Sequence, residues 1–253
     1  MSSARLAGSV CLVTGATSGI GRAIALRFGT EDVRLLLSGR DLDLLEEVTA
    51  ATGGAALAAD LREPGAGKRL GAAALEVHGR VDVLVNAAGC GQYGPVTELR
   101  AEELEELVRV NIAAPIELAS SLLPGMIERQ SGHIVTIGSI SGRLGRRNEA
   151  AYAATKAALS VFSESLRDEV AGTGVAVSLV TLGAVDTSFF ARRGAPYDRS
   201  WPRPLHPETV AEQVVDLLGS RRAEVIVPRW LNLPLRLRGA LPELYHALAR
   251  RFD

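Results

Sequence analysis

Short, wholly apolar runs alternate along the chain with longer segments that mix apolar and polar residues. The apolar runs predict strands at residues 10–13, 35–37, 55–59, 81–85, 133–137, 175–181 and 224–227. The mixed segments predict helices at residues 22–28, 42–51, 68–77, 101–122, 150–170 and 207–218. Runs without polar alternation are typical of strands that are buried on both faces of a sheet. The alternation therefore predicts an α/β fold with a doubly wound parallel sheet and helices on both faces.

Two regions do not follow this alternation. Residues 184–207 are rich in Arg, Pro and aromatic residues and lack periodicity, which predicts a mobile loop. The tail, residues 228–253, places leucines among arginines and is amphipathic and basic. The remainder shows no repeat, low-complexity tract or linker, so residues 1–227 are expected to form a single domain.

A tyrosine and a lysine, Tyr152 and Lys156, stand four residues apart in a predicted helix. The chain has only two lysines against twenty-six arginines, so chance is a poor explanation for a lysine at this spacing from a tyrosine. Four residues make one helical turn, which places both side chains on one face. A cation about 4 Å from a phenol, at an effective dielectric of about 20, contributes about 4 kcal/mol. That is about three pKa units before any opposing desolvation, so Lys156 is expected to bring the pKa of Tyr152 near ~7 for acid-base catalysis.

A glycine-rich segment connects the first predicted strand to the first predicted helix. Its glycines, Gly15, Gly19 and Gly21, have the spacing G-x-x-x-G-x-G. Glycines let the backbone approach phosphate groups, and the helix N-terminus offers free N–H groups and the positive end of a dipole. The strand–turn–helix context favours a pyrophosphate-binding turn over an ordinary tight turn.

With these features the chain resembles the short-chain dehydrogenase/reductase family. The resemblance is carried by Thr14-Gly15-x-x-x-Gly19-x-Gly21, Asn86-Ala87-Ala88-Gly89, Asn111, Ser139 and Tyr152-x-x-x-Lys156. These residues lie in one order over nearly the whole expected domain, with a step of thirteen residues from Ser139 to Tyr152. The resemblance implies a Rossmann-type sheet of seven strands in the order 3-2-1-4-5-6-7. It also implies an enzyme that interconverts a carbonyl and a secondary alcohol with a nicotinamide cofactor.

The resemblance also implies four catalytic residues. Tyr152 would donate or remove the proton of the substrate hydroxyl, and Lys156 would lower its pKa and bind the nicotinamide ribose. Ser139 would hydrogen-bond the substrate carbonyl, and its distance from Tyr152 favours it over Ser141. Asn111, a mediocre helix former within a predicted helix, would kink that helix and hold a water in a proton relay with the lysine.

Further residues are expected at the cofactor. Asn86 and its neighbours would support the sheet and the adenine ribose, Asp60 would accept a hydrogen bond from the adenine amine, and Thr187 would contact the nicotinamide amide. Leu182 replaces the family's usual proline before Gly183. The full expected set is Gly15, Thr17, Ser18, Gly19, Ile20, Gly21, Ser38, Arg40, Asp60, Leu61, Asn86, Ala87, Ala88, Gly89, Tyr152, Lys156, Gly183, Val185 and Thr187.

The choice of cofactor is expected to depend on the residues after the second strand. An enzyme that uses NAD(H) places an acid there to bind both ribose hydroxyls. Here the matching position is Gly39, between Ser38 and Arg40, and Arg40 could bind a 2′-phosphate. Family enzymes that use NADP(H) often carry a second basic residue inside the glycine turn. At that position this chain has Ser18. The charge pattern favours NADP(H), with NAD(H) as the alternative.

Composition and charge exclude several other functions. The net charge of −1 and the aromatic content of 4% give no basis for nucleic-acid binding. The four histidines are scattered and the two cysteines do not form a disulfide scaffold, so no metal site is expected. No apolar leader precedes residue 10 and no apolar run approaches the ~20 residues of a membrane span, which favours a cytoplasmic protein.

Partners and substrate are only partly defined by the sequence. The residue 184–207 loop is expected to cover the substrate pocket, with Phe189, Phe190, Tyr197 and Trp201 as an apolar lining. A small ketone or alcohol is the expected substrate, and family members are usually dimers or tetramers through two long helices. A dinucleotide-binding regulator without turnover is the alternative function, which a complete catalytic set opposes.

The tail has three candidate roles: packing over the pocket, contacting another subunit or lying on an anionic membrane. Leucines from Leu241 to Leu248 follow helical spacing, and Arg250 and Arg251 would favour the dipole at the helix C-terminus. Glu243 lies where a membrane helix would carry bases. The pattern therefore favours a packed tail or a subunit contact.

Overall fold

The computed structural model describes residues 6–198 and 201–249. Its strands pair in parallel in the order β3-β2-β1-β4-β5-β6-β7. Their bounds are β1 (Ser9–Thr14), β2 (Val33–Gly39), β3 (Ala55–Ala58), β4 (Val83–Asn86), β5 (Gly132–Ser139), β6 (Val175–Leu182) and β7 (Glu224–Val227). The predicted Rossmann-type sheet and its strand order are therefore confirmed.

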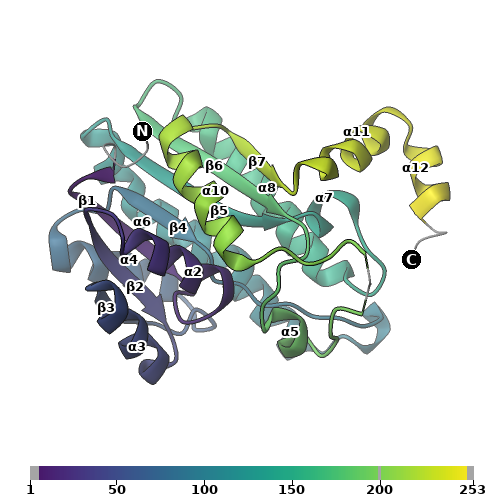
Figure 1. Cartoon of the computed structure of the whole chain (residues 1–253), viewed down its shortest axis with the longest axis horizontal. Coiled ribbons are helices and arrows are strands. Elements are labelled where there is room, and N and C mark those ends of the chain that lie inside the picture. Colours follow the sequence, from purple (N-terminus) through teal and green to yellow (C-terminus); the bar gives the residue numbers. More distant parts are fainter. Residues whose placement is uncertain (1–5, 199–200, 250–253) are drawn as a thin grey trace.

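Helices connect the strands and cover both faces of the sheet (Figure 1). The longer helices are α2 (Gly19–Phe28), α3 (Leu42–Thr52), α4 (Ala66–His78), α5 (Ala101–Val108), α6 (Ala114–Glu128), α8 (Ala150–Glu169), α10 (Pro207–Ser220), α11 (Asn232–Ala240) and α12 (Pro242–Ala249). Two single-turn α-helices are α7 (Ser141–Leu144) and α9 (Phe189–Arg192), and the 3-10 turns are η1 (Val96–Glu98) and η3 (Arg229–Leu231). Every helix predicted from the sequence is present.

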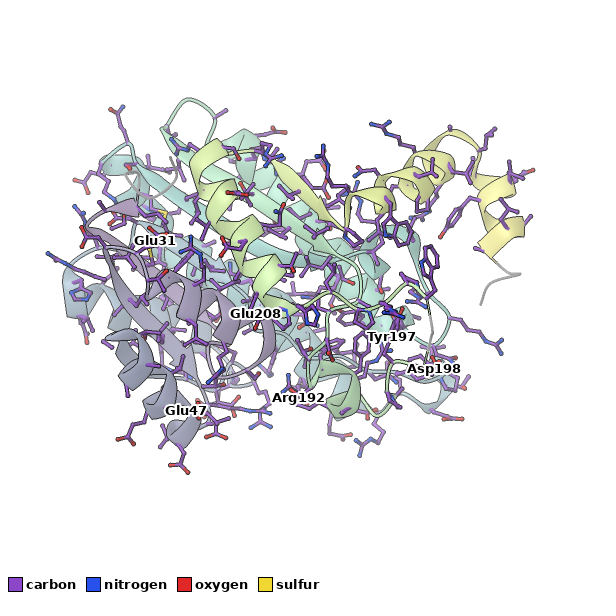
Figure 2. All side chains as sticks on the ribbon, viewed as in Figure 1. Glu31, Glu47, Arg192, Tyr197, Asp198 and Glu208 are labelled. Atoms are coloured by element: carbon purple, nitrogen blue, oxygen red, sulfur yellow. The ribbon has the colours of Figure 1, made fainter. Side chains whose placement is uncertain are left out.

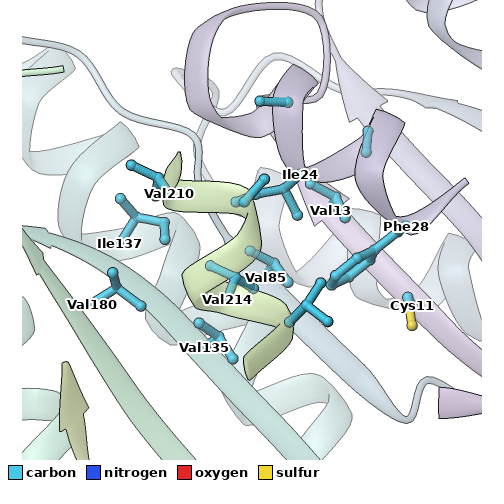
Figure 3. Close-up of a cluster of buried hydrophobic side chains, with 14 of the residues drawn as sticks. Cys11, Val13, Ile24, Phe28, Val85, Val135, Ile137, Val180, Val210 and Val214 are labelled. Atoms are coloured by element: carbon cyan, nitrogen blue, oxygen red, sulfur yellow. The ribbon is translucent and has the colours of Figure 1, made fainter. Parts of the chain in front are cut away.

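Each strand contributes to two hydrophobic layers, because successive residues face opposite sides of the sheet. In β1, Cys11 and Val13 face the layer beneath α2, α3 and α10, whereas Val10 and Leu12 face α4, α6 and α8. Figure 3 shows the first layer, with Phe28 of α2 packed beside side chains of α10 and the strands. Burial on both faces explains why the strands read as continuous apolar runs.

The carboxyl ends of the central strands form the edge on which the site is built. Thr14 ends β1, Gly39 ends β2, Asn86 ends β4 and Ser139 ends β5. Between β1 and β4 the order of the strands reverses, so the following loops diverge and leave a crevice. The fold therefore brings together the glycine turn, Arg40 and the catalytic residues, which are far apart in the sequence.

The helix predicted at residues 101–122 is continuous but not uniform. A π-helical turn, η2 (Arg109–Ala113), joins α5 to α6. By length and composition alone, the stretch Ala101–Glu128 could cross a membrane, with a mean hydropathy of 1.3. Leu118, Leu122 and Met126 of α6 instead pack into the second hydrophobic layer. The stretch thus serves as a core helix, interrupted beside the site.

Two parts of the chain differ from the sequence-based expectation. Residues 184–207 are more structured than a mobile loop, because they contain α9 and a bridge between Val185 and Leu205. In the tail, α12 forms as predicted, but α11 and α12 extend beyond the end of β7 and away from the sheet (Figure 1). Arg250 and Arg251 lie outside the described residues.

Candidate active site

A cleft of about 870 Å³ opens at the carboxyl edge of the sheet. It runs from the glycine turn, past the ends of β2, β4 and β5, to the loop after β6. Eighteen of the nineteen expected cofactor-binding residues line the cleft together with Ser139. The tail contributes none of the lining residues in the described part of the chain. Packing of the tail over the pocket is therefore not seen within one chain, and a subunit contact stays a prediction.

Asn86 does not line the cleft, and Asp60 lines it but is engaged by a neighbouring cation. Asn86 is buried behind the cleft, and its side-chain amide has no hydrogen-bond partner among the described residues. Asp60 does line the cleft, but both its oxygens accept hydrogen bonds from Arg62, which lowers the pKa of the Asp60 carboxyl to about 2. The Asp60 carboxylate would therefore have to share or leave Arg62 in order to bind an adenine amine.

The glycine turn has the shape that a phosphate group requires. Gly15 and Gly19 have positive φ angles of 68° and 51°, which glycine adopts without strain. A Cβ atom on Gly21 would lie 2.2 Å from the carbonyl oxygen of Gly15. At the N-terminus of α2 no side chain caps the helix, and its first turn contains no acid. The exposed N–H groups and the dipole therefore suit an anion.

Thr14 supports this turn in a way that the sequence did not reveal. Its Oγ1 accepts hydrogen bonds from the backbone N–H groups of Ala87 and Ala88, both at 3.1 Å. The same hydroxyl donates to the carbonyl oxygen of Val85 at 3.4 Å. Thr14 thus ties the glycine turn to the end of β4, which is the supporting role that was expected of Asn86.

The end of β2 presents a free cation to the cleft. Arg40 is exposed, lines the cleft and has no hydrogen-bond or ion-pair partner among the described residues. The next residue, Asp41, accepts a hydrogen bond from the N–H of Leu44 at 3.1 Å and so caps α3. The acid that follows Arg40 in the sequence is therefore engaged in the helix and Asp60 is paired with Arg62, so the guanidinium of Arg40 is available to an anionic group.

The candidate catalytic residues Tyr152 and Lys156 lie on one face of α8, as predicted from their spacing. Both side chains are buried and line the cleft, and Ser139 lies opposite them at the end of β5. Lys156 Nζ donates a hydrogen bond to the carbonyl oxygen of Ile137 at 3.1 Å, which holds the ammonium against β5. Ser141, the alternative serine, also lines the cleft but is buried and donates to Glu149 at 2.6 Å, whereas the Ser139 hydroxyl hydrogen-bonds Tyr152.

The predicted lowering of the tyrosine pKa is wrong for this structure. Burial raises the pKa of Tyr152 to about 12, against a lowering effect of the Ser139 hydroxyl. Burial also lowers the pKa of the Lys156 ammonium to about 8. The sequence-based value took account of charge attraction alone, whereas desolvation opposes the charged form of both groups.

Asn111 lies in the π-helical turn and locks two segments together. Its Oδ1 accepts a hydrogen bond from the N–H of Cys90 at 3.0 Å, and its Nδ2 donates to the carbonyl oxygen of Cys90 at 2.9 Å and to Thr155 Oγ1 at 3.0 Å. The predicted interruption of the helix is confirmed. Because both amide hydrogens are engaged, the side chain acts here as a structural bridge between the loop after β4 and α8.

A conservative change of the lysine tests the packing around its ammonium. Lys156→Arg is expected to reduce turnover at least about tenfold, because a planar fork cannot occupy the position of a compact ammonium in this buried site. Steady-state kinetics over a range of pH values would measure it. Lys68→Arg, at the only other and exposed lysine, is the matched control. Wild-type rate and pH dependence in Lys156→Arg would contradict the assignment.

Only part of the predicted aromatic lining reaches the cleft. Phe189 and Phe190 line it, and the ring centroid of Phe189 lies 5.5 Å from that of Tyr152. Tyr197 packs behind Phe190, with ring centroids 5.2 Å apart, and Figure 2 shows it on the same side of the molecule as Arg192. Trp201 is 70% exposed and stacks on Trp230 of the tail. The prediction is therefore wrong for Tyr197 and Trp201.

Several cleft residues carried no recognisable signal in the sequence. Arg62 binds Asp60, and Arg193 forms a buried ion pair with Glu149 at 2.7 Å. Their partners are distant in sequence or lie in an irregular loop, so no periodicity indicates them. No group of three or more potential metal ligands occurs within residues 6–198 and 201–249.

A sheet with this strand order, a glycine turn at its switch point and a tyrosine–lysine pair beside it defines a dinucleotide-dependent oxidoreductase. The family described as short chain dehydrogenase matches residues 9–198. Dehydrogenase/reductase SDR family member 7B of Mus musculus is 30% identical over 261 residues, which cover 96% of this chain and 81% of the mouse protein. This chain belongs to the short-chain dehydrogenase/reductase family and is an NAD(P)-dependent dehydrogenase or reductase.

Solved structures agree with this assignment. A short-chain dehydrogenase from Sphingobium yanoikuyae in complex with NADPH has a TM-score of 0.80 and 29% identity, covering 93% of this chain and 95% of that one. A short-chain dehydrogenase/reductase from Burkholderia phymatum in complex with NAD has a TM-score of 0.85 and 25% identity, covering 95% and 96%. The similar structures therefore include one with each cofactor.

Proposed function

We propose that this protein is an NADP(H)-dependent oxidoreductase that interconverts a carbonyl and a secondary alcohol on a largely apolar, uncharged substrate. The observation that carries the proposal is the convergence of Tyr152, Lys156 and Ser139 at one end of a cleft whose other end holds the glycine turn and Arg40. A binding protein without turnover has no use for a buried proton donor. The alternative of a non-catalytic regulator therefore accounts for less of the site.

The residues divide the chemistry between them. The nicotinamide group supplies or accepts the hydride when it is bound. Ser139 positions the substrate oxygen, and Tyr152 delivers a proton to it during reduction or removes one during oxidation. Because the pKa of Tyr152 is about 12, the phenol is protonated at neutral pH, which is the form that carbonyl reduction needs. The ammonium of Lys156 supports negative charge that develops on the phenol oxygen.

The preference for NADP(H) rests on the free guanidinium of Arg40. A 2′-phosphate beside it would gain a charge-assisted hydrogen bond, and the nearby acid, Asp41, is engaged in capping α3. Bound NADPH in the similar Sphingobium structure agrees with this preference. NAD(H) is the second candidate, since the similar Burkholderia structure holds NAD.

The apolar character of the substrate follows from the loop after β6. Phe189 and Phe190 face the reacting end of the cleft, and the cation of Arg193 is already paired with Glu149. Exposed apolar residues on the long helices, such as Val108 and Val161, would suit the contact of a homodimer or homotetramer. We also propose that the protein is located in the cytoplasm.

Hydride transfer itself is the first test. The purified protein is expected to oxidise NADPH in the presence of at least one apolar ketone from a broad panel, followed by the loss of absorbance of the reduced nicotinamide. Tyr152→Phe in the same assay is the control for uncatalysed transfer. Tight binding of NADPH without turnover on any panel member, in either direction, would favour the regulator.

Replacing Arg40 tests the cofactor preference. Arg40→Asp is expected to weaken NADPH binding by roughly ten- to hundredfold, because one charge-assisted contact worth about 1.5–3 kcal/mol becomes a repulsion. Binding of NADH should change much less. Titrating both cofactors against both proteins measures the effect, and Arg229→Asp, in the tail, is a charge-matched control. Equal affinity of the unaltered protein for both cofactors would contradict the proposal.

A further inference from the structure

A buried ion pair joins the loop after β6 to the start of the catalytic helix. Arg193 Nη1 lies 2.7 Å from Glu149 Oε1, and the two side chains are only 8% and 5% exposed. Arg193 follows α9, and Glu149 is the N-cap of α8, three residues before Tyr152. Both residues line the cleft. The pair is thus part of the wall of the site.

Hydrogen bonds connect the carboxylate of this pair, through Ser141, to Ser139. Glu149 Oε2 accepts a hydrogen bond from Ser141 Oγ at 2.6 Å. The backbone N–H of Ser141 donates in turn to Ser139 Oγ at 3.2 Å. A line of polar contacts therefore runs from the loop after β6 to the hydroxyl that faces the substrate oxygen.

The guanidinium is held by aromatic rings as well as by the carboxylate. Arg193 Cζ lies 4.7 Å from the ring centroid of Phe190, 5.0 Å from that of Tyr93 and 5.9 Å from that of Phe189. These rings belong to the loop after β4 and to α9. Stacking and cation–π attraction suit a planar guanidinium better than a lysine ammonium. Arg193 therefore connects three segments around the reacting end of the cleft.

We propose that Arg193 and Glu149 are positioning residues that fasten the substrate loop to the catalytic helix and balance the charge around the phenol of Tyr152. A buried ion pair is a weak source of stability, because desolvation offsets most of its attraction. Its location between the substrate loop and the proton donor gives the pair a functional use. The part of the proposal that concerns the phenol rests on the proposed acid-base role of Tyr152.

The two members of the pair act on Tyr152 in opposite directions. After burial and the Ser139 hydroxyl, the Glu149 carboxylate raises the pKa of Tyr152, the Arg193 guanidinium lowers it and the Cys90 thiol raises it. The ammonium of Lys156 and the guanidinium groups of Arg146 and Arg192 also line the cleft. Removing one member should therefore leave the charge of the other uncompensated beside the phenol.

Single neutral variants provide the test. In alcohol oxidation Tyr152 acts as a base, so the rate rises with pH below its pKa of about 12, and a change in that pKa moves the whole rise along the pH axis. Glu149→Gln should move the midpoint of that rise to lower pH, and Arg193→Met should move it to higher pH, each by about half a unit or more. The Glu149→Gln/Arg193→Met double variant should return the midpoint toward that of the unaltered protein. The readout is the pH dependence of kcat/KM with the full chain.

A second readout follows the loop. Arg193→Met should raise KM more than it lowers kcat at the optimal pH, and should increase proteolytic cleavage within residues 184–207. Glu47→Gln is the matched control, because Glu47 of α3, labelled in Figure 2, forms an exposed ion pair with Arg22 of α2, and neither residue lines the cleft. Melting temperatures identify any variant that fails to fold. If a single variant does, the double variant, which lacks both charges of the pair, provides the test.

The outcomes separate this inference from the proposed function. Shifts of the midpoint in opposite directions, with the double variant intermediate, support the charge balance. Shifts in the same direction, or unchanged midpoints with reduced rates, overturn it and leave the pair as packing alone. Full turnover in Tyr152→Phe would instead contradict the proposed function. The charge balance is tested with variants of Glu149 and Arg193, and the proposed function with Tyr152→Phe, so failure of one proposal is distinguishable from failure of the other.

Discussion

Tyr152→Phe is expected to lower turnover at least about 10²-fold, because the change removes the only atom that can donate the proton. The ring remains, so its packing beside Phe189 at 5.5 Å and the buried face of α8 are preserved. Binding of NADPH should stay within a few-fold of the unaltered protein. Single-turnover kinetics with a deuterated cofactor measures the effect on the chemical step itself.

The control for this prediction is a tyrosine that lies outside the cleft. Tyr197→Phe removes a hydroxyl that donates to the carbonyl oxygen of Pro202, and neither Tyr197 nor Pro202 lines the cleft. Its turnover should remain near that of the unaltered protein. Near-normal turnover in Tyr152→Phe, with hydride transfer shown to limit the rate, would mean that another group delivers the proton.

Gly21→Ala is expected to abolish most cofactor binding. A Cβ atom at this position would lie 2.2 Å from the carbonyl oxygen of Gly15 and 3.0 Å from that of Thr14, so the backbone of the turn must move. Losing two phosphate hydrogen bonds of about 1.5 kcal/mol each would reduce affinity about 10²-fold. Fluorescence titration with NADPH measures the change, and a thermal melt shows whether the fold survives.

A matched glycine elsewhere separates this effect from general strain. Gly239 lies in α11, far from the turn along the chain, and a Cβ atom there would meet no other atom within 4 Å. Gly239→Ala should bind NADPH as the unaltered protein does, and its helix should be slightly favoured. If Gly21→Ala is folded and binds NADPH equally well, the turn does not hold the phosphates in the proposed way.

The order of the strands and helices was predictable because each signal is local. A short continuous apolar run such as that of β1 is typical of a strand buried on both faces, and the glycine turn after it determines where α2 begins. The spacing of Tyr152 and Lys156 in one helix placed them on one face, as the structure confirms. These properties depend on residues within one or two helical turns.

The pKa values were not predictable in the same way. Attraction between a phenol and an ammonium can be calculated from a spacing, but desolvation depends on what covers both groups. In the folded chain both side chains are buried, so the pKa of Tyr152 rises to about 12 and that of Lys156 falls to about 8. Burial of this kind is created by segments remote in sequence, including the loop after β6.

Sequence alone determined the class of fold and the glycine turn, because local periodicity and backbone conformation encode them, and it indicated the candidate catalytic residues through short spacings and a family resemblance. Tertiary structure decided which polar groups face each other across the cleft. In the folded chain Thr14 supports the loop after β4, and Arg193 pairs with Glu149. Tyr197 and Trp201 pack outside the pocket. Such contacts join segments that are distant along the chain, and only the packed fold fixes the distances on which hydrogen bonds and desolvation depend.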